Sequence, residues 1–277
     1  MWLVGLCLVA AGLQAADLTE QEKAIVGELK TLRKVPDEQR GAVTRRIALE
    51  IRNLAPDASK VGLANGLASL STEGDFGHGT LQEVGTTLAE ALREQPAQQA
   101  EPYLELAQLV RYEHVATSLD NAQFKTALDT LEANDRDRQR ADFTLNDLSG
   151  KAWTLKSLSG HIVLVNFWAT WCPPCRKEMP DLDAIYKQYK DQGLIVLAIS
   201  DEEHAKVTGY LAQHAVSYPV LLDAGRKVNE AFHVDGIPKT FVFDRDGKLV
   251  AESIDMRTQR QFFAMLAQAG LQPLESK

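Results

Sequence analysis

Residues 163–180 read VLVNFWATWCPPCRKEMP, and this stretch decides how the second half of the chain is expected to fold. The run from Ile162 to Val165 is apolar and rich in β-branched residues, which is typical of a strand buried on both faces. After the second cysteine, apolar residues recur at helical spacing from Met179 to Ile185. The stretch therefore predicts a strand that passes into a helix through Cys172-Pro173-Pro174-Cys175.

A C-x-x-C pair at the start of a helix is suited to redox chemistry. The N–H groups of a first helical turn lack intrahelical partners and the helix dipole favours an anion there, so we expect a stabilised, nucleophilic thiolate at Cys172. Cys175 lies one turn further on, close enough to form a disulfide with it. Pro173 and Pro174 fit a first turn, whose N–H groups have no partners to lose.

A zinc site and a purely structural disulfide are the alternatives. Zinc in proteins takes four protein ligands, or three and a water molecule. The one other cysteine of the sequence is Cys7, and no histidine lies within twenty residues after Cys175. A disulfide across two residues closes too short a loop to add much stability. We therefore expect a redox-active Cys172–Cys175 disulfide, with no metal and no other cofactor.

Two motifs resemble the thioredoxin superfamily, and within it the extracytoplasmic TlpA/ResA-like branch. One is VNFWATWCPPCRKEMP, and the other is GIPKTFVFDRDG at residues 236–247. The resemblance covers about residues 141–277 and implies an α/β thioredoxin-like fold, with a mixed sheet and helices on both faces. The order of strand-like and helix-like patterns in this half agrees with that fold. The resemblance says nothing about residues 17–140.

The resemblance also implies how a substrate would be held and attacked. It implies a cis peptide bond at Ile237–Pro238, which would place the Ile237 backbone beside Cys172 to bind an extended substrate. Cys172, nearer the helix end and expected to be more exposed, would attack, and Cys175 would resolve the mixed disulfide. The residues expected to contact the substrate are Trp171, Pro173, Pro174, Ile237 and Pro238.

Asn166 and Glu178 have to be interpreted together. Many cytoplasmic thioredoxins carry a buried aspartate at the position of Asn166, as proton acceptor for the inner cysteine, and this chain departs from that pattern. In the TlpA/ResA-like branch a glutamate three residues after the second cysteine is proposed for that role, and Glu178 stands there. The resemblance therefore implies that Glu178 takes the proton of Cys175. The alternative is a surface glutamate that stabilises the first helical turns.

The first sixteen residues, MWLVGLCLVAAGLQAA, are apolar and carry no charged side chain. A run of this length is typical of a signal peptide, so we expect a periplasmic or otherwise extracytoplasmic protein, with an uncleaved anchor as the alternative. Removal of the segment would remove Cys7 and leave only the C-x-x-C pair. The net charge of −8 argues against nucleic acid or an anionic membrane as a general partner.

Residues 17–140 show a helical pattern that Pro36 and Pro56 interrupt. We expect an all-helical domain, an antiparallel bundle or a short solenoid, whose function the sequence does not indicate; it could bind a protein partner or dimerise. Residues 134–140, NDRDRQR, are charged and lack apolar anchors, so they are expected to be a frayed helix end or a linker. The thioredoxin-like domain is expected to follow at residues 141–277.

These features together predict a thiol–disulfide oxidoreductase. The favoured hypothesis is an exported reductant of protein disulfides, whose targets by resemblance include the haem-site cysteines of apocytochrome c, with electrons from a membrane thiol–disulfide carrier. A disulfide oxidase or isomerase, and a scaffold or binding protein built on the helical domain, are the alternatives. A peroxidase is disfavoured because Thr170 precedes Cys172 by two residues, whereas a peroxidatic cysteine normally follows a threonine by three.

Overall fold

The structure, a computed structural model, describes residues 18–272, and its internal contacts divide the chain into two units between Leu131 and Glu132. The expected signal peptide, residues 1–16, lies outside the described residues. The contact division falls nine residues before the boundary expected after Arg140, inside a helix.

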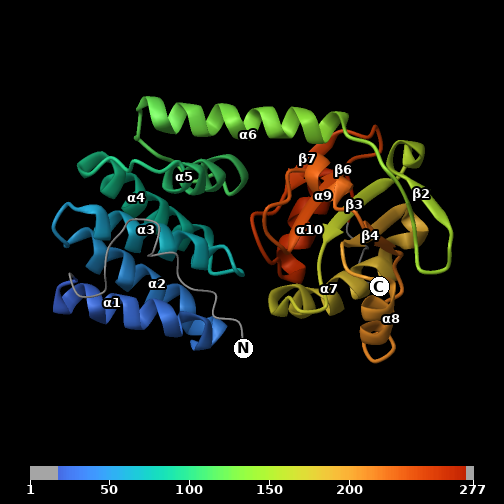
Figure 1. Ribbon diagram of the computed structural model, residues 1–277, viewed down its shortest axis with the longest axis horizontal. Coiled ribbons are helices and arrows are strands. Elements are labelled where there is room, and N and C mark those ends of the chain that lie inside the picture. The colour runs from blue at the N-terminus through green and yellow to red at the C-terminus, as the bar shows by residue number, and fades with distance from the viewer. Residues whose placement is uncertain (1–17, 273–277) are drawn as a thin grey trace. The chain divides into compact units, whose positions relative to one another are not determined.

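The described part of the first unit is built of helices, as its sequence predicts. Helix α1 begins at a capping box, in which the Thr19 hydroxyl accepts from the Glu22 amide and the Glu22 carboxylate accepts from the Thr19 amide. Helix α4 packs against α2, α3 and α5 (Figure 1). The elements are α1 (Glu20–Thr31), η2 (Leu32–Lys34), α2 (Asp37–Arg52), α3 (Ala58–Ser71), α4 (His78–Glu94), α5 (Glu101–Tyr112) and the start of α6 (Ala122–Arg140).

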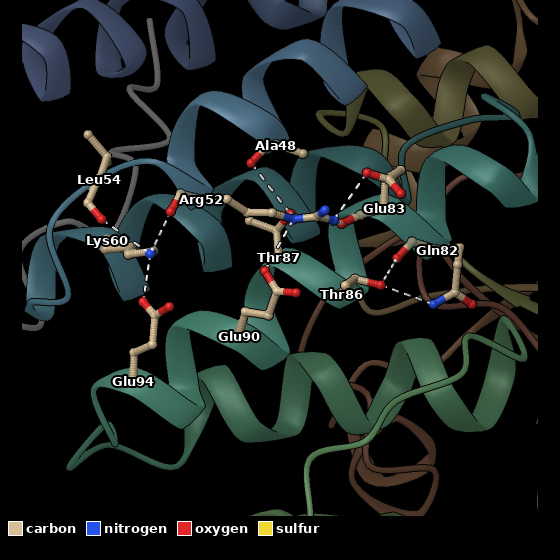
Figure 2. A network of polar contacts seen from close by, with 10 residues as sticks. All are labelled: Ala48, Arg52, Leu54, Lys60, Gln82, Glu83, Thr86, Thr87, Glu90 and Glu94. Carbon is tan, nitrogen blue, oxygen red and sulfur yellow. Dashed lines mark hydrogen bonds and ion pairs between the residues drawn. The ribbon is translucent and has the colours of Figure 1, made fainter.

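A buried lysine joins three of these helices (Figure 2). Lys60 of α3 donates from Nζ to the carbonyl oxygens of Arg52, at 2.8 Å, and Leu54, at 3.2 Å, and pairs with Glu94 Oε2 of α4 at 2.6 Å. It thus satisfies carbonyls at the end of α2 that have no helical partner. Arg52 itself donates to the Glu83 carbonyl and the Thr87 hydroxyl of α4.

The second unit contains a five-stranded mixed sheet with the strand order β5-β4-β3-β6-β7. Strands β3, β4 and β5 are parallel, while β6 runs antiparallel to both β3 and β7. The strands are β3 (Ile162–Phe167), β4 (Leu194–Ser200), β5 (Val220–Leu222), β6 (Lys239–Phe243) and β7 (Leu249–Glu252), and a separate hairpin pairs β1 (Thr144–Asn146) with β2 (Ala152–Thr154). This is the thioredoxin-like fold that the sequence predicts.

Apolar cores lie on both faces of the sheet because side chains of β3 alternate between them. Ile162 and Leu164 join the core formed with α7 and α10, whereas Val163, Val165 and Phe167 join the core that contains Phe232. The remaining elements are η3 (Leu155–Leu158), α7 (Pro173–Tyr189), η4 (Lys190–Gln192), α8 (His204–Leu211), α9 (Lys227–Ala231) and α10 (Gln259–Gln268). Figure 1 shows α7 and α10 beside the central strands.

Residues 134–140 differ from the expected linker or frayed helix end, because α6 continues as helix through Arg140. Polar side chains anchor it where the sequence offers no apolar ones. Gln139 accepts from the Leu249 amide at 2.7 Å and donates to the Gly247 carbonyl at 2.9 Å, which fixes the helix end to the β6–β7 turn. Arg138 is 3% exposed and forms further buried contacts. The end of α6 is therefore part of the second unit.

Candidate redox site

Cys172 and Cys175 form a disulfide with an S–S distance of 2.02 Å and a Cα–Cα distance of 5.3 Å. Cys172 is the N-cap of α7, and its sulfur accepts a hydrogen bond from the Cys175 amide at 3.3 Å. Pro173 and Pro174 occupy the first turn, where they cost no helical hydrogen bond. The sulfur of Cys172 thus lies at the positive end of the helix, as the sequence predicts.

The two sulfurs differ less in exposure than the sequence suggests. Cys172 is 2% exposed and Cys175 is fully buried, whereas the adjacent Trp171 is 67% exposed. The expected order holds, but Cys172 is not an exposed residue in the disulfide form.

The Ile237–Pro238 peptide bond is cis, as the resemblance implies. Cys172 Sγ lies 3.7 Å from the Ile237 carbonyl oxygen. The pairing of β6 with β3, with Lys239 opposite Phe167, brings this segment to the edge where α7 begins. Ile237 is half-buried and Pro238 is buried, while Pro173 at the start of α7 is exposed. Of the residues expected to contact a substrate, Trp171, Pro173 and Pro174 adjoin the cysteines in the chain, and the structure brings the Ile237 carbonyl next to Cys172.

Glu178 is a buried acid and not a surface residue, with an exposed fraction of 1%. Its Oε1 accepts from Asn166 Nδ2 at 2.8 Å, and its Oε2 accepts from the Arg257 amide at 3.0 Å. Burial raises the pKa of Glu178 to about 8, against the two hydrogen bonds, which favour the carboxylate. A buried carboxyl with this pKa can take up and release a proton near neutral pH, one helical turn from Cys175.

Glu202 holds the loop before Cys172, and sequence reasoning missed it. Its Oε2 accepts from the Thr170 amide at 2.5 Å and its Oε1 accepts from the Thr170 hydroxyl at 3.0 Å. The signal was an acid two residues beyond a buried strand: β3 and β4 are parallel, so their carboxyl ends meet at one sheet edge. Thr240 was also missed; its hydroxyl accepts from Asn166 Nδ2 at 3.0 Å.

Within residues 18–272, no three His, Cys, Asp or Glu side chains gather closely enough to bind a metal ion. Over the same residues, no helix combines the length and the apolar character that a membrane crossing requires.

The known proteins that this chain resembles match its second half. A model of the AhpC/TSA family matches residues 137–252. The thiol-disulfide oxidoreductase ResA of Bacillus thuringiensis (strain Al Hakam) is 38% identical over 125 residues, which are 45% of this chain and 72% of the relative. ResA of Bacillus subtilis (strain 168) is 39% identical over 110 residues, 39% of this chain and 62% of that protein.

Among solved structures, a thiol:disulfide interchange protein of the thioredoxin family from Chlorobium tepidum TLS matches with a TM-score of 0.43 and 32% identity. The match covers 46% of this chain and 92% of that chain.

Proposed function

The chain belongs, through its C-terminal half, to the ResA family of thiol-disulfide oxidoreductases, and from this premise we propose that it reduces disulfides of protein clients outside the cytoplasm. The observation that supports thiol–disulfide exchange is the pairing of a helix-capping sulfur, Cys172, with a buried acid of raised pKa, Glu178, one turn beyond Cys175. The reductant direction is proposed from the resemblance to the TlpA/ResA-like branch. The apolar residues 1–16 and the absence of a cysteine beyond Cys7 and this pair support an oxidising compartment.

The proposed reaction starts from the reduced dithiol. The Cys172 thiolate attacks one sulfur of a client disulfide, forms a mixed disulfide and releases the first client thiolate. The Cys175 thiolate then attacks Cys172 Sγ, which closes the disulfide seen here and releases the second client thiolate. Two electrons pass from the dithiol to the client. An external dithiol, which we propose to be a membrane thiol–disulfide carrier, must reduce Cys172–Cys175 again.

Glu178 is proposed to manage the proton of Cys175. Cys175 must lose its thiol proton before it can attack, and it is fully buried, away from solvent bases. A carboxyl whose pKa is about 8 is matched to a thiol, whose ordinary pKa is about 8.5, so proton transfer between them costs little free energy. The amide of Asn166 cannot take this role, but its hydrogen bond orients Glu178.

The backbone of Ile237 is proposed to bind the client. An extended peptide that pairs with a free strand-like segment gains main-chain hydrogen bonds without sequence specificity. Such binding suits an enzyme that acts on several proteins, among which we propose apocytochrome c with its haem-site cysteines. Trp171, 67% exposed, adds an apolar surface next to the attacking sulfur.

The test is a set of three measurements on the full chain. Wild type should reduce insulin disulfides with dithiothreitol as electron donor, and Cys172→Ser should abolish this activity. Cys175→Ser should trap clients as mixed disulfides through Cys172, and the trapped proteins identify the physiological targets. Equilibrium with glutathione gives the potential: a strongly oxidising value would replace the reductant role with that of an oxidase. A chain without a reversible dithiol couple would refute both.

A further inference from the structure

A single guanidinium from the end of α6 reaches the segment that carries Ile237. Arg138 donates from Nε to the Phe232 carbonyl at 2.8 Å and from Nη2 to the His233 carbonyl at 3.4 Å. These two carbonyls stand directly before residues 234–238. The neighbouring Asp137 adds a contact from its Oδ2 to His233 Nε2 at 3.3 Å. The start of the segment is thus tied to α6, in addition to backbone hydrogen bonds with α9 such as that from the Val234 amide to the Asn229 carbonyl at 2.9 Å.

The same guanidinium reaches the other end of the segment through an ion pair. Arg138 Nη1 lies 2.8 Å from Glu252 Oε2 of β7, and Glu252 Oε1 lies 2.5 Å from Lys239 Nζ. Lys239 follows Pro238 directly and begins β6. These three residues, Arg138, Glu252 and Lys239, form the Arg138 cluster, in which each is less than a tenth exposed.

The Arg138 cluster has charged neighbours of both signs. Asp135, at 3.1 Å from Arg138 Nη1, supplies a second carboxylate, and the buried Arg257 is a third cation. Burial lowers the pKa of Lys239, the charge of Arg257 adds to that shift, and the adjacent Glu252 carboxylate opposes it. Buried charges that are paired in this way hold their partners in defined positions, because a displaced partner leaves a charge uncompensated.

We propose that Arg138 is a positioning residue, which holds residues 233–238 at both ends and thereby keeps the Ile237 backbone in place to bind client polypeptide beside Cys172. The inference rests on the proposed function. Ile237 is 3.7 Å from Cys172 Sγ through its carbonyl oxygen, so a small shift of the segment changes how a client strand is presented to the sulfur. Arg138 itself touches neither sulfur nor client.

The test compares Arg138→Met with Arg136→Met in the full chain. Arg136 lies on the same helix, is exposed and pairs with Glu132 at 2.7 Å, so it controls for a lost arginine. Arg138→Met leaves the buried Lys239–Glu252 pair intact, and the fold is expected to persist. Each variant is assayed with insulin, which can pair along Ile237, and with bis(2-hydroxyethyl) disulfide, which has no peptide backbone.

A positioning role predicts a selective effect. For Arg138→Met, the KM for insulin should rise about tenfold, the factor expected when one or two hydrogen bonds are lost, while the rate with the small disulfide stays within about twofold. A merely structural role would lower both activities by one factor, through fewer folded molecules, and that result overturns the proposal, as does an unchanged KM.

A second variant, Arg138→Lys, tests the proposal if Arg138→Met does not fold. Arg138→Lys keeps the charge against Glu252 but lacks the fork that reaches Phe232 and His233 together, so it should raise the KM for insulin by a smaller, still selective factor. Without such a selective rise the proposal fails. Should wild type and Arg136→Met both be unable to reduce insulin, the proposed function itself fails; with both active, an unselective Arg138 variant refutes only the positioning role.

Discussion

Asn166 donates its side-chain amide to Glu178 Oε1 over 2.8 Å, and both side chains are 1% exposed. This contact and the Arg257 amide each stabilise the carboxylate, yet burial outweighs them and the pKa of Glu178 rises to about 8. An amide at position 166 therefore leaves Glu178 as the titrating member of this hydrogen-bonded pair, and the charge of Asp255 adds to the rise in its pKa. A second carboxyl at this distance would share a proton with Glu178 and couple the two titrations.

The raised pKa of Glu178 predicts a specific pH dependence of stability. In the unfolded chain the carboxyl has a pKa near 4.5, and in the folded chain near 8. The contribution of this group to the free energy of unfolding is therefore fully present below about pH 4.5. It is lost as the pH rises to about 8, and the loss is up to about 5 kcal/mol. Glu178→Gln cannot titrate and should remove that slope.

Chemical denaturation of the oxidised protein at several pH values between 5 and 8.5 measures this slope of the free energy of unfolding with pH. Tryptophan fluorescence reports mainly the second unit, which contains Trp153, Trp168 and Trp171, three of the four tryptophans; the fourth is Trp2. Glu203→Gln, an exposed neighbour of Glu202, serves as the control and should retain the wild-type slope. Equal slopes for wild type and Glu178→Gln would mean that Glu178 is already ionised at neutral pH and would remove it from the proton step.

Elements with a strong local pattern could be predicted from the sequence, and elements held by distant polar partners could not. The strand from Ile162 and the helix after Cys172 carry their own apolar periodicity. The last turns of α6 do not. Arg138 finds its partners Phe232 and Glu252 at separations of 94 and 114 residues, so no window of sequence contains the reason that this segment is helical.

Two glycines of α4 should respond oppositely to alanine. A Cβ on the buried Gly85 would lie 2.5 Å from Val115 Cγ1, so Gly85→Ala should lower the free energy of unfolding by about 1–3 kcal/mol. The exposed Gly79 has nothing within 4 Å, and Gly79→Ala should raise it by about 0.5 kcal/mol through a lower unfolded-state entropy. Chemical denaturation followed by far-ultraviolet circular dichroism checks both. A neutral Gly85→Ala would show that Val115 moves aside freely.

Lys60 is expected to be the most sensitive lysine of the helical unit. Its side chain is 3% exposed, and Lys60→Met would leave the Arg52 and Leu54 carbonyls without their donor, at a cost of about 2–4 kcal/mol. Lys23 is half exposed and pairs only with Glu20 three residues away, so Lys23→Met should change stability by less than about 0.5 kcal/mol. Equal effects of the two variants in urea denaturation would contradict the capping role of Lys60.

The same distinction, between local sequence patterns and distant partners, separates the redox-site residues that could be predicted from those that could not. Cys172 and Cys175 stand in a C-x-x-C motif that spacing alone identifies, whereas Pro238 and its cis bond required the resemblance. Glu178 required the resemblance, since nothing in its local sequence separates a buried acid from a surface one. Glu202 required the register of β3 with β4, because its partner Thr170 lies 32 residues earlier.

Glu202 should matter to catalysis through the loop it holds. Its carboxylate accepts both the amide and the hydroxyl of Thr170, two residues before Cys172, whereas a glutamine offers a single acceptor oxygen and would turn an N–H group toward a donor. Losing one charge-assisted hydrogen bond costs about 1.5 kcal/mol, so kcat/KM of Glu202→Gln for insulin should fall about tenfold.

Glu203→Gln, at the next position and exposed, should match wild type. Thr170→Val keeps the amide bond and loses only the hydroxyl, so its activity should lie between those of wild type and Glu202→Gln. Wild-type activity in Glu202→Gln would show that the loop is fixed by its backbone alone.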